Sequence, residues 1–215
     1  IGAPTGLTFA FSGIQPSLLG PGSAPTFAPD AYAICYNNLG VAQWATVFGG
    51  TGNDLATCVA VDPTSRDCIV AGLTDGGAGT FFTTGSGIIP FGGGGLDAFV
   101  ARFVAGGIPI FSSYVGGNGA DQASDVSVDA ASKIYLTGIT TSTNLFANVP
   151  TAATLFTGVP AGSANTVFVM CLDYAPVAPA TTASLTANWG TTYGPTSSFM
   201  SLGSIATGTN NETTI

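Results

Sequence analysis

Short apolar runs separated by turn residues recur along this chain and predict β-strands. Two such runs, residues 57–61 and 68–71, flank a turn in "TCVAVDPTSRDCIVAG", which is typical of a β-hairpin. Polar and apolar residues alternate in "DVSVDAASKIYLTG", as they do in a strand with one buried face. We find no stretch of ten or more residues with the 3.6-residue apolar period of a helix. The pattern therefore predicts an all-β protein.

A longer pattern repeats at a fixed interval. The segment that begins at Val47, "VFGGTGNDLATCVAVD", returns in similar form at Tyr114 as "YVGGNGADQASDVSVD". Matching residues such as Asp54 and Asp121 are 67 positions apart. A third, degraded copy contains "NTVFVMCLDY" and "NWGTTYG", with an Ala-, Pro- and Thr-rich insertion between them at residues 175–187. Self-similarity at a fixed period predicts a repeat architecture.

The repeats organise residues 1–215 as a single domain with three units. They cover residues 30–75, residues 97–142 and, in degenerate form, residues 165–210. Each unit ends in a strand with a glycine, in "CIVAGLT", "IYLTGIT" and "SIATGTN", and a spare closing strand of the same kind, "TFAFSGI", lies within residues 1–14. Four strands can be drawn in each unit, and four antiparallel strands form the blade of a β-propeller. We expect a β-propeller-like array of about three four-stranded antiparallel blades plus an extra N-terminal strand.

The repeat motifs also resemble a known family. The resemblance rests on "QWATVFGGTGNDLATCVAVD", "GGGGLDAFVARF" and "FSSYVGGNGADQASDVSVDAASKIYLTGITTS", which are similar to the repeats of the SBBP, or seven-bladed β-propeller, family. The third unit keeps Trp189, Tyr193 and Gly208 but lacks the Gly-Gly-x-Gly-x-Asp block. The resemblance implies a propeller-type fold in exported or surface proteins, and it implies no catalytic residue.

Composition and charge narrow the possible functions. Only 7% of residues are charged, and the net charge of −8 includes just three cations. A chain without a basic stripe does not neutralise phosphates, so we expect no nucleic-acid partner. No apolar run approaches the roughly 20 residues of a membrane-spanning helix. The chain begins with Ile rather than Met, which suggests a processed product, and we expect an extracellular, secreted or particle-associated location.

The acidic residues allow two interpretations, and neither is catalytic. The chain contains no His, which removes the common Ser-His and Cys-His nucleophile pairs, so we expect no enzyme and no catalytic residue. Asp54 and Asp121 each lie in a Gly-rich block, where a carboxylate can accept hydrogen bonds from amides of the turn. They are also candidate calcium ligands, but each block supplies one carboxylate where calcium takes six to eight oxygens, which favours the turn. We expect no other cofactor.

The four cysteines do not define a disulfide pattern. If Val61 pairs with Cys68 across the hairpin and Cys58 pairs with Ala71, the two cysteines point to opposite faces of the sheet and do not bond to each other. Cys35 occupies an opening strand, as does Cys171 in the third unit. Small buried side chains and disulfides formed elsewhere are both compatible with this placement.

The aromatic residues divide into periodic and irregular ones. Periodic aromatics are typical of packing between blades, and they are Tyr32, Trp44, Phe99, Phe111, Phe168 and Trp189. Irregular aromatics in the long connections and on the extra strand are our candidates for partner binding. These candidates are Phe81, Phe82, Phe146, Phe9 and Phe11.

The number of units favours assembly. Propellers typically have four to eight blades, so three units do not close a ring comfortably. The extra strand can close the ring of its own chain, or it can be lent to a neighbour by β-strand addition. We expect a structural or assembly protein of a cell surface, filament or virion that associates with itself or with other subunits. The alternative is a glycan- or protein-binding propeller module.

Overall fold

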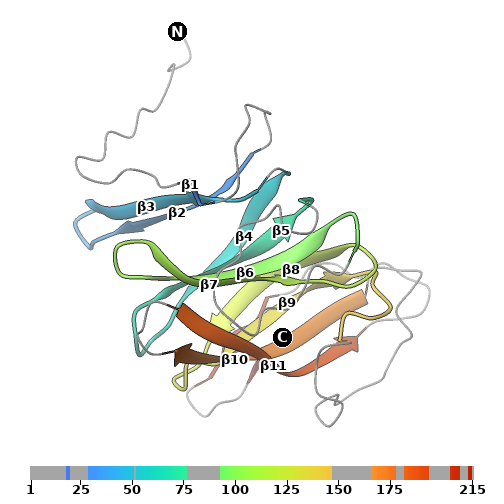
Figure 1. Cartoon of the computed structure of the whole chain (residues 1–215). Coiled ribbons are helices and arrows are strands. Elements are labelled where there is room, and N and C mark those ends of the chain that lie inside the picture. The colour runs from blue at the N-terminus through green and yellow to red at the C-terminus, as the bar shows by residue number, and fades with distance from the viewer. Residues whose placement is uncertain are drawn as a thin grey trace, which may run out of the picture.

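A computed structural model of the chain describes residues 18–19, 29–50, 52–76, 93–146, 166–177, 182–193, 204–208 and 213–214. Every regular element in these ranges is a β-strand. The strands form sheets that lie against one another in layers (Figure 1). The prediction of an all-β fold is confirmed, and the part of the chain that is described contains no closed ring of sheets.

The first sheet contains the opening strands of the first unit. Strands β2 (Ala31–Tyr36) and β3 (Ala42–Phe48) pair antiparallel. A two-residue strand, β1 (Leu18–Leu19), pairs parallel to β3 on its other side. The strand order is β1-β3-β2, so β2 lies at one edge of the first sheet.

The second sheet is a four-stranded antiparallel meander. It contains β4 (Asp54–Val61), β5 (Cys68–Thr74), β6 (Asp97–Val104) and β7 (Ile108–Val115), in the order of the sequence. In the β4–β5 hairpin, Val61 pairs with Cys68 and Cys58 with Ala71. This register is the predicted one.

The third sheet repeats this arrangement with longer outer strands. It contains β8 (Asp121–Val128), β9 (Ile134–Thr140), β10 (Thr166–Val177) and β11 (Thr182–Tyr193). Strands β10 and β11 have 12 residues each, against eight in β6 and β7. Much of the predicted insertion at residues 175–187 therefore extends a regular hairpin.

The sheets do not coincide with the sequence units. Each four-stranded sheet combines the closing hairpin of one unit with the opening hairpin of the next, so residues 97–142 contribute β6 and β7 to the second sheet and β8 and β9 to the third. The link between the two halves is the pairing of β5 with β6 and of β9 with β10. The sequence predicts one blade for each unit, whereas in the structure each four-stranded sheet is shared by two consecutive units.

The third unit differs from the prediction at its end. Gly72 and Gly138 lie inside β5 and β9, whereas Gly208 follows β12 (Ala206–Thr207). Strand β12 pairs antiparallel with β13 (Thr213–Thr214). The segment "SIATGTN" thus begins a hairpin like β4–β5 and β8–β9, and it does not form a closing strand.

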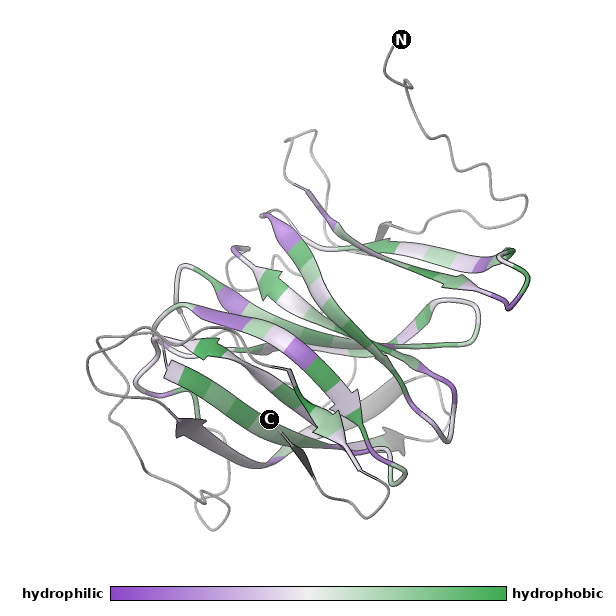
Figure 2. Cartoon of the chain, turned by 180° about the vertical axis from the view of Figure 1, so that it is seen from behind, coloured by the Kyte–Doolittle hydropathy of each residue, from purple (hydrophilic) through white to green (hydrophobic). Residues whose placement is uncertain are grey.

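Apolar residues run along the strands (Figure 2) and form a core between each pair of layers. One cluster lies between the second and third sheets and includes Phe111 and Phe168, and another lies between the first and second sheets and includes Trp44 and Phe99. Trp189 packs in a third cluster on the outer face of the third sheet. The predicted packing role of these periodic aromatics is confirmed, but Tyr32, which belongs to the same set, is 66% exposed.

Equivalent strands of consecutive units hold the second and third sheets together. The Thr57 hydroxyl donates a hydrogen bond to the carbonyl of Ala123 (2.8 Å), and the Thr64 hydroxyl donates one to the carbonyl of Ala130 (3.0 Å). The partners are 66 residues apart in both pairs. Strand β4 therefore lies alongside β8, and the repeat in the sequence becomes a stack of similar sheets.

Candidate partner-binding site

The two Gly-rich blocks form matching turns around a buried carboxylate. Asp54 Oδ2 accepts a hydrogen bond from the Gly50 amide (2.6 Å). Asp121 Oδ2 accepts one from the Gly117 amide (2.7 Å) and one from the Ser142 hydroxyl (2.6 Å). Burial raises the pKa of both carboxyl groups, against the opposing effect of these hydrogen bonds. The contacts are those of the predicted turns.

The same turns were candidates for calcium binding. Neither Asp54 Oδ1 nor Asp121 Oδ1 has a hydrogen-bond partner among the described residues. Those residues also contain no group of three or more Asp, Glu, Cys or His side chains that could hold a metal ion. The turn interpretation accounts for the bonded oxygens, and the calcium interpretation stays a prediction.

A buried ion-pair cluster lies next to the turn of the β4–β5 hairpin. Arg102, on β6, is only 1% exposed, and its guanidinium lies 2.7 Å from both Asp62 Oδ2 and Asp67 Oδ2. It also donates to the Ser65 hydroxyl (2.8 Å) and lies 3.8 Å from the centre of the Tyr174 ring on β10. The cluster links the second sheet to the third.

The protonation of this cluster follows from its contacts. Burial by itself raises the pKa of Asp62, but the Ser132 hydroxyl, the Ser65 and Thr64 amides and the Arg102 charge together lower it below its ordinary value. Sequence analysis did not single out Arg102. The available signal was one charge inside the otherwise apolar strand "DAFVARFV".

The cysteines occupy the predicted faces. Cys58 packs against the cluster between the second and third sheets, whereas Cys68 and Cys35 pack against the cluster between the first and second. Cys58 and Cys68 thus lie on opposite faces, as predicted, and all four cysteines are free thiols. Burial raises the pKa of Cys58, Cys68 and Cys171 to about 11, so none is an activated nucleophile.

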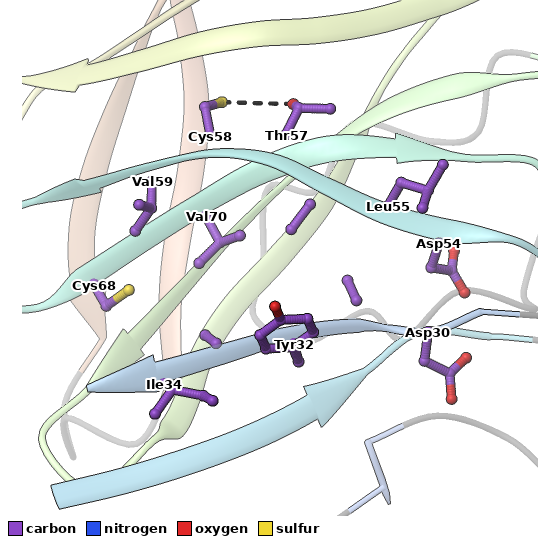
Figure 3. A pocket seen from close by; sticks show the side chains of 13 residues that line it. Asp30, Tyr32, Ile34, Asp54, Leu55, Thr57, Cys58, Val59, Cys68 and Val70 are labelled. Atoms are coloured by element: carbon purple, nitrogen blue, oxygen red, sulfur yellow. Dashed lines mark hydrogen bonds between the residues drawn. The ribbon is translucent and has the colours of Figure 1, made fainter. Parts of the chain in front are cut away.

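A cleft of about 350 Å³ lies between β2 of the first sheet and β4 of the second; we call it the β2–β4 cleft. Tyr32 and Ile34 line it from β2, and Leu55 and Val59 line it from β4 (Figure 3). Asp30 and Asp54 lie together at one end of the cleft (Figure 3). The walls are mostly apolar, which suits another chain better than a charged small molecule.

Comparison with the next layer shows why the β2–β4 cleft exists. Val59 and Val61 of β4 are 63% and 57% exposed, whereas the equivalent Val126 and Val128 of β8 are 4% and 8% exposed. The β4–β5 hairpin covers the two valines of β8. Within the described residues, the first sheet has no closing hairpin to cover those of β4. The cleft therefore lies at the place that the closing hairpins β4–β5 and β8–β9 occupy in the second and third sheets.

The exposed tyrosines of β2 also show that, in the described part of the chain, the first sheet lacks neighbouring strands that the second sheet has. Tyr32 and Tyr36 are 66% and 53% exposed, and the equivalent residues of β6, Phe99 and Phe103, are fully buried. Phe99 lies between β5 and β7 and beneath the first sheet. Tyr32 has only β3 beside it among the described strands.

Among the partner-binding residues predicted from the sequence, Phe146 alone lies in the described part of the chain. Phe81, Phe82, Phe9 and Phe11 lie outside the described residues. Phe146 is half-buried, packs against the main core cluster, and its ring lies directly over Gly190 of β11. Its position is that of a packing residue. Sequence analysis does not single out Tyr32 and Val59 at the cleft, because each looks like an ordinary core residue of its unit.

No family model and no curated protein sequence matches this chain. The resemblance to the SBBP repeats therefore stays a prediction. Among the described residues there is no helix with the length and hydropathy required to cross a membrane.

Proposed function

We propose that this chain is a non-enzymatic structural protein of an extracellular or particle surface, built from β-propeller repeats that associate with neighbouring subunits. The β2–β4 cleft is the observation that carries the proposal. It exposes Val59 and Tyr32, whose equivalents Val126 and Phe99 are buried one layer further along. Exposed apolar surface of this kind is typical of a protein interface.

The propeller part of the proposal rests on contacts that recur between layers. The Asp54 amide donates to the Pro29 carbonyl (2.7 Å), and the equivalent Asp121 amide donates to the Leu96 carbonyl (2.8 Å). Each opening strand is thus tied to the next closing strand in the same way. Identical steps between sheets are what blades of a propeller need, and an array of three units leaves a ring incomplete.

The low charge of the chain supports association through apolar and backbone contacts. With 7% charged residues and three cations, few ion pairs are available across an interface. We therefore expect the assembly to persist at high salt, since screening weakens exposed charge pairs but not apolar burial.

The native mass of the purified chain tests this function. Light scattering after gel filtration, with negative-stain images of the same sample, is expected to show a dimer or a larger assembly. Val59→Asp, in the cleft, is expected to release monomers, whereas Ile108→Asp is not. Ile108 is a matched control because it is 58% exposed but lies on β7, away from the cleft. A wild-type monomer at every concentration would contradict the proposal and favour the binding-module alternative.

A further inference from the structure

We propose that the open edge of β2 binds residues 8–14 of a second copy of this chain as an added β-strand. The inference rests on the proposed function and specifies how neighbouring subunits associate. In the two four-stranded sheets, the strands equivalent to β2 are β6 and β10, and each has a strand on both sides. Strand β2 has β3 on one side and, among the described residues, nothing paired on the other. Such an edge can pair with a strand of another chain.

The neighbouring sheets define what this edge accepts. Gly72 of β5 pairs with Phe99 of β6, and Gly138 of β9 pairs with Phe168 of β10. A Cβ on either glycine would approach the paired aromatic ring, to 2.9 Å for Gly72 and 2.6 Å for Gly138. It would also collide with a backbone oxygen of β4 or β8, on the other side of the glycine-containing strand. The contact with the aromatic ring alone favours a glycine opposite the aromatic residue in an added strand, and in β2 that residue is Tyr32.

Residues 8–14 meet this requirement. Their sequence, "TFAFSGI", has a glycine near its end, as "CIVAGLT" of β5 and "IYLTGIT" of β9 do. With Gly13 opposite Tyr32, the antiparallel register places Ala10 opposite Cys35. This register places Phe9 opposite Tyr36 and Phe11 opposite Ile34, so both predicted partner-binding residues of the segment would lie beside β2.

The alternation of side chains matches the two sides of the site. Ala10 and Ser12 correspond to Ile69 and Ala71 of β5, which pack in the same cluster as the valines of β8. They would thus face the exposed valines of β4 with small side chains. Phe9 and Phe11 point to the other face, the face of Tyr32 and Tyr36. The added strand would cover apolar surface on one side and extend it on the other.

The position of β1 indicates a second copy as the source of the strand. Leu18 pairs with Val47 of β3, so β1 lies at the edge of the first sheet opposite to β2. Ile14 is four residues from Leu18, a span of at most about 14 Å. The straight path across three strand spacings is also about 14 Å and runs through the sheet itself. A chain whose β1 is in place cannot place its own residues 8–14 beside β2.

A thiol at position 10 tests the register and the source together. Ala10→Cys, in a Cys68→Ser background that removes the neighbouring thiol, is oxidised and run on a non-reducing gel, and free thiols are counted by mass. We expect a covalent dimer or ladder that disappears on adding Cys35→Ser. The matched control is Phe11→Cys, whose thiol points to the opposite face. The cross-linked fraction of the Ala10 variant should exceed that of the control at least about tenfold, because facing thiols have an effective concentration of order mM.

The alternative outcomes separate this inference from the proposed function. An intrachain disulfide between positions 10 and 35 would show that the strand comes from the same chain and would overturn the second-copy source. Equal cross-linking of Ala10→Cys and Phe11→Cys, in a protein that still assembles by light scattering, would overturn the β2 site and leave the assembly proposal intact. Failure to assemble at all would overturn both. Gly13→Val is a second variant, which should abolish the cross-link without unfolding the sheets.

Discussion

Replacing Arg102 by methionine removes the only positive charge that contacts two buried carboxylates, Asp62 and Asp67, in the described part of the chain. Methionine keeps much of the volume of the side chain and loses the charge-assisted hydrogen bonds. Breaking a buried ion pair by removing one partner costs about 3–5 kcal/mol, because the remaining charge is left without compensation. The variant should therefore be much less stable than the wild type at neutral pH.

The contacts that remain in Arg102→Met place the expected decrease in the free energy of unfolding at the lower end of that range. Asp62 Oδ1 keeps its hydrogen bonds from the Thr64 amide (2.8 Å) and the Ser65 amide (3.1 Å), so the carboxylate is not entirely unsatisfied. We expect a decrease in the free energy of unfolding of about 3 kcal/mol. With a urea dependence of about 2 kcal/mol per molar, this lowers the unfolding midpoint by about 1.5 M.

Urea titration followed by tryptophan fluorescence measures the change, and Lys133→Met is the matched control. Lys133 pairs with Asp173 at 3.0 Å, but the two side chains are 38% and 45% exposed. Ion pairs in solvent contribute about 0–1 kcal/mol. The control should therefore unfold close to the wild type. Equal effects of the two substitutions would refute the view that burial makes the Arg102 cluster important.

The pH dependence provides an independent check. Because the pKa of Asp62 is lowered in the folded state from the usual value of 3.8, its contribution is present above that value and is lost as the pH falls through the folded pKa. The stability difference between the wild type and Arg102→Met should therefore shrink below pH 3.8. A difference that stays constant on acidification would show that lost packing, and not lost charge, destabilises the variant.

Two further predictions concern the sheet and the thiols. Gly138→Ala should lower the free energy of unfolding by about 2 kcal/mol or more, since its Cβ would collide with a backbone oxygen and the Phe168 ring. The control Gly95→Ala has open space around the new Cβ and should change the free energy of unfolding by less than about 0.5 kcal/mol. Similar effects of the two substitutions in urea titration would contradict the close approach at Gly138. Because burial raises the pKa of Cys58 and Cys68 to about 11, both should react slowly with iodoacetamide near pH 8 and rapidly in urea, as measured by mass spectrometry.

The local features of this fold were accessible from the sequence because they depend on neighbouring residues. The two apolar runs that flank the turn at residues 62–67 predict the β4–β5 hairpin, its register and the opposite faces of Cys58 and Cys68. The positions of Trp44 and Phe111 in the core followed from their period. Such features need only the two-residue period of a strand and the chemistry of a turn.

The features that were missed depend on which strands meet in space. Nothing in the sequence of β5 shows that it pairs with β6 across a long connection, so the sequence repeat predicts one sheet for each unit. The repeat predicts a core position for Tyr32 because its equivalents are core residues, but the exposure of Tyr32 depends on its place in the first sheet, at the end of the stack. The sequence does not single out Arg102, because the two carboxylates that it contacts lie 35 and 40 residues away in the chain.

The offset between units and sheets decides where this chain can be divided. A fragment that follows the sequence repeat, such as residues 97–142, would contain half of each of two sheets and would leave two strand edges open. A fragment of residues 52–115 would contain β4 to β7 and therefore one complete sheet, together with Arg102 and both of its ion-pair partners. The sequence repeat follows the first kind of segment, whereas each four-stranded sheet corresponds to the second kind. Consecutive units are therefore linked through a shared sheet, and among the described strands no unit completes a four-stranded sheet on its own.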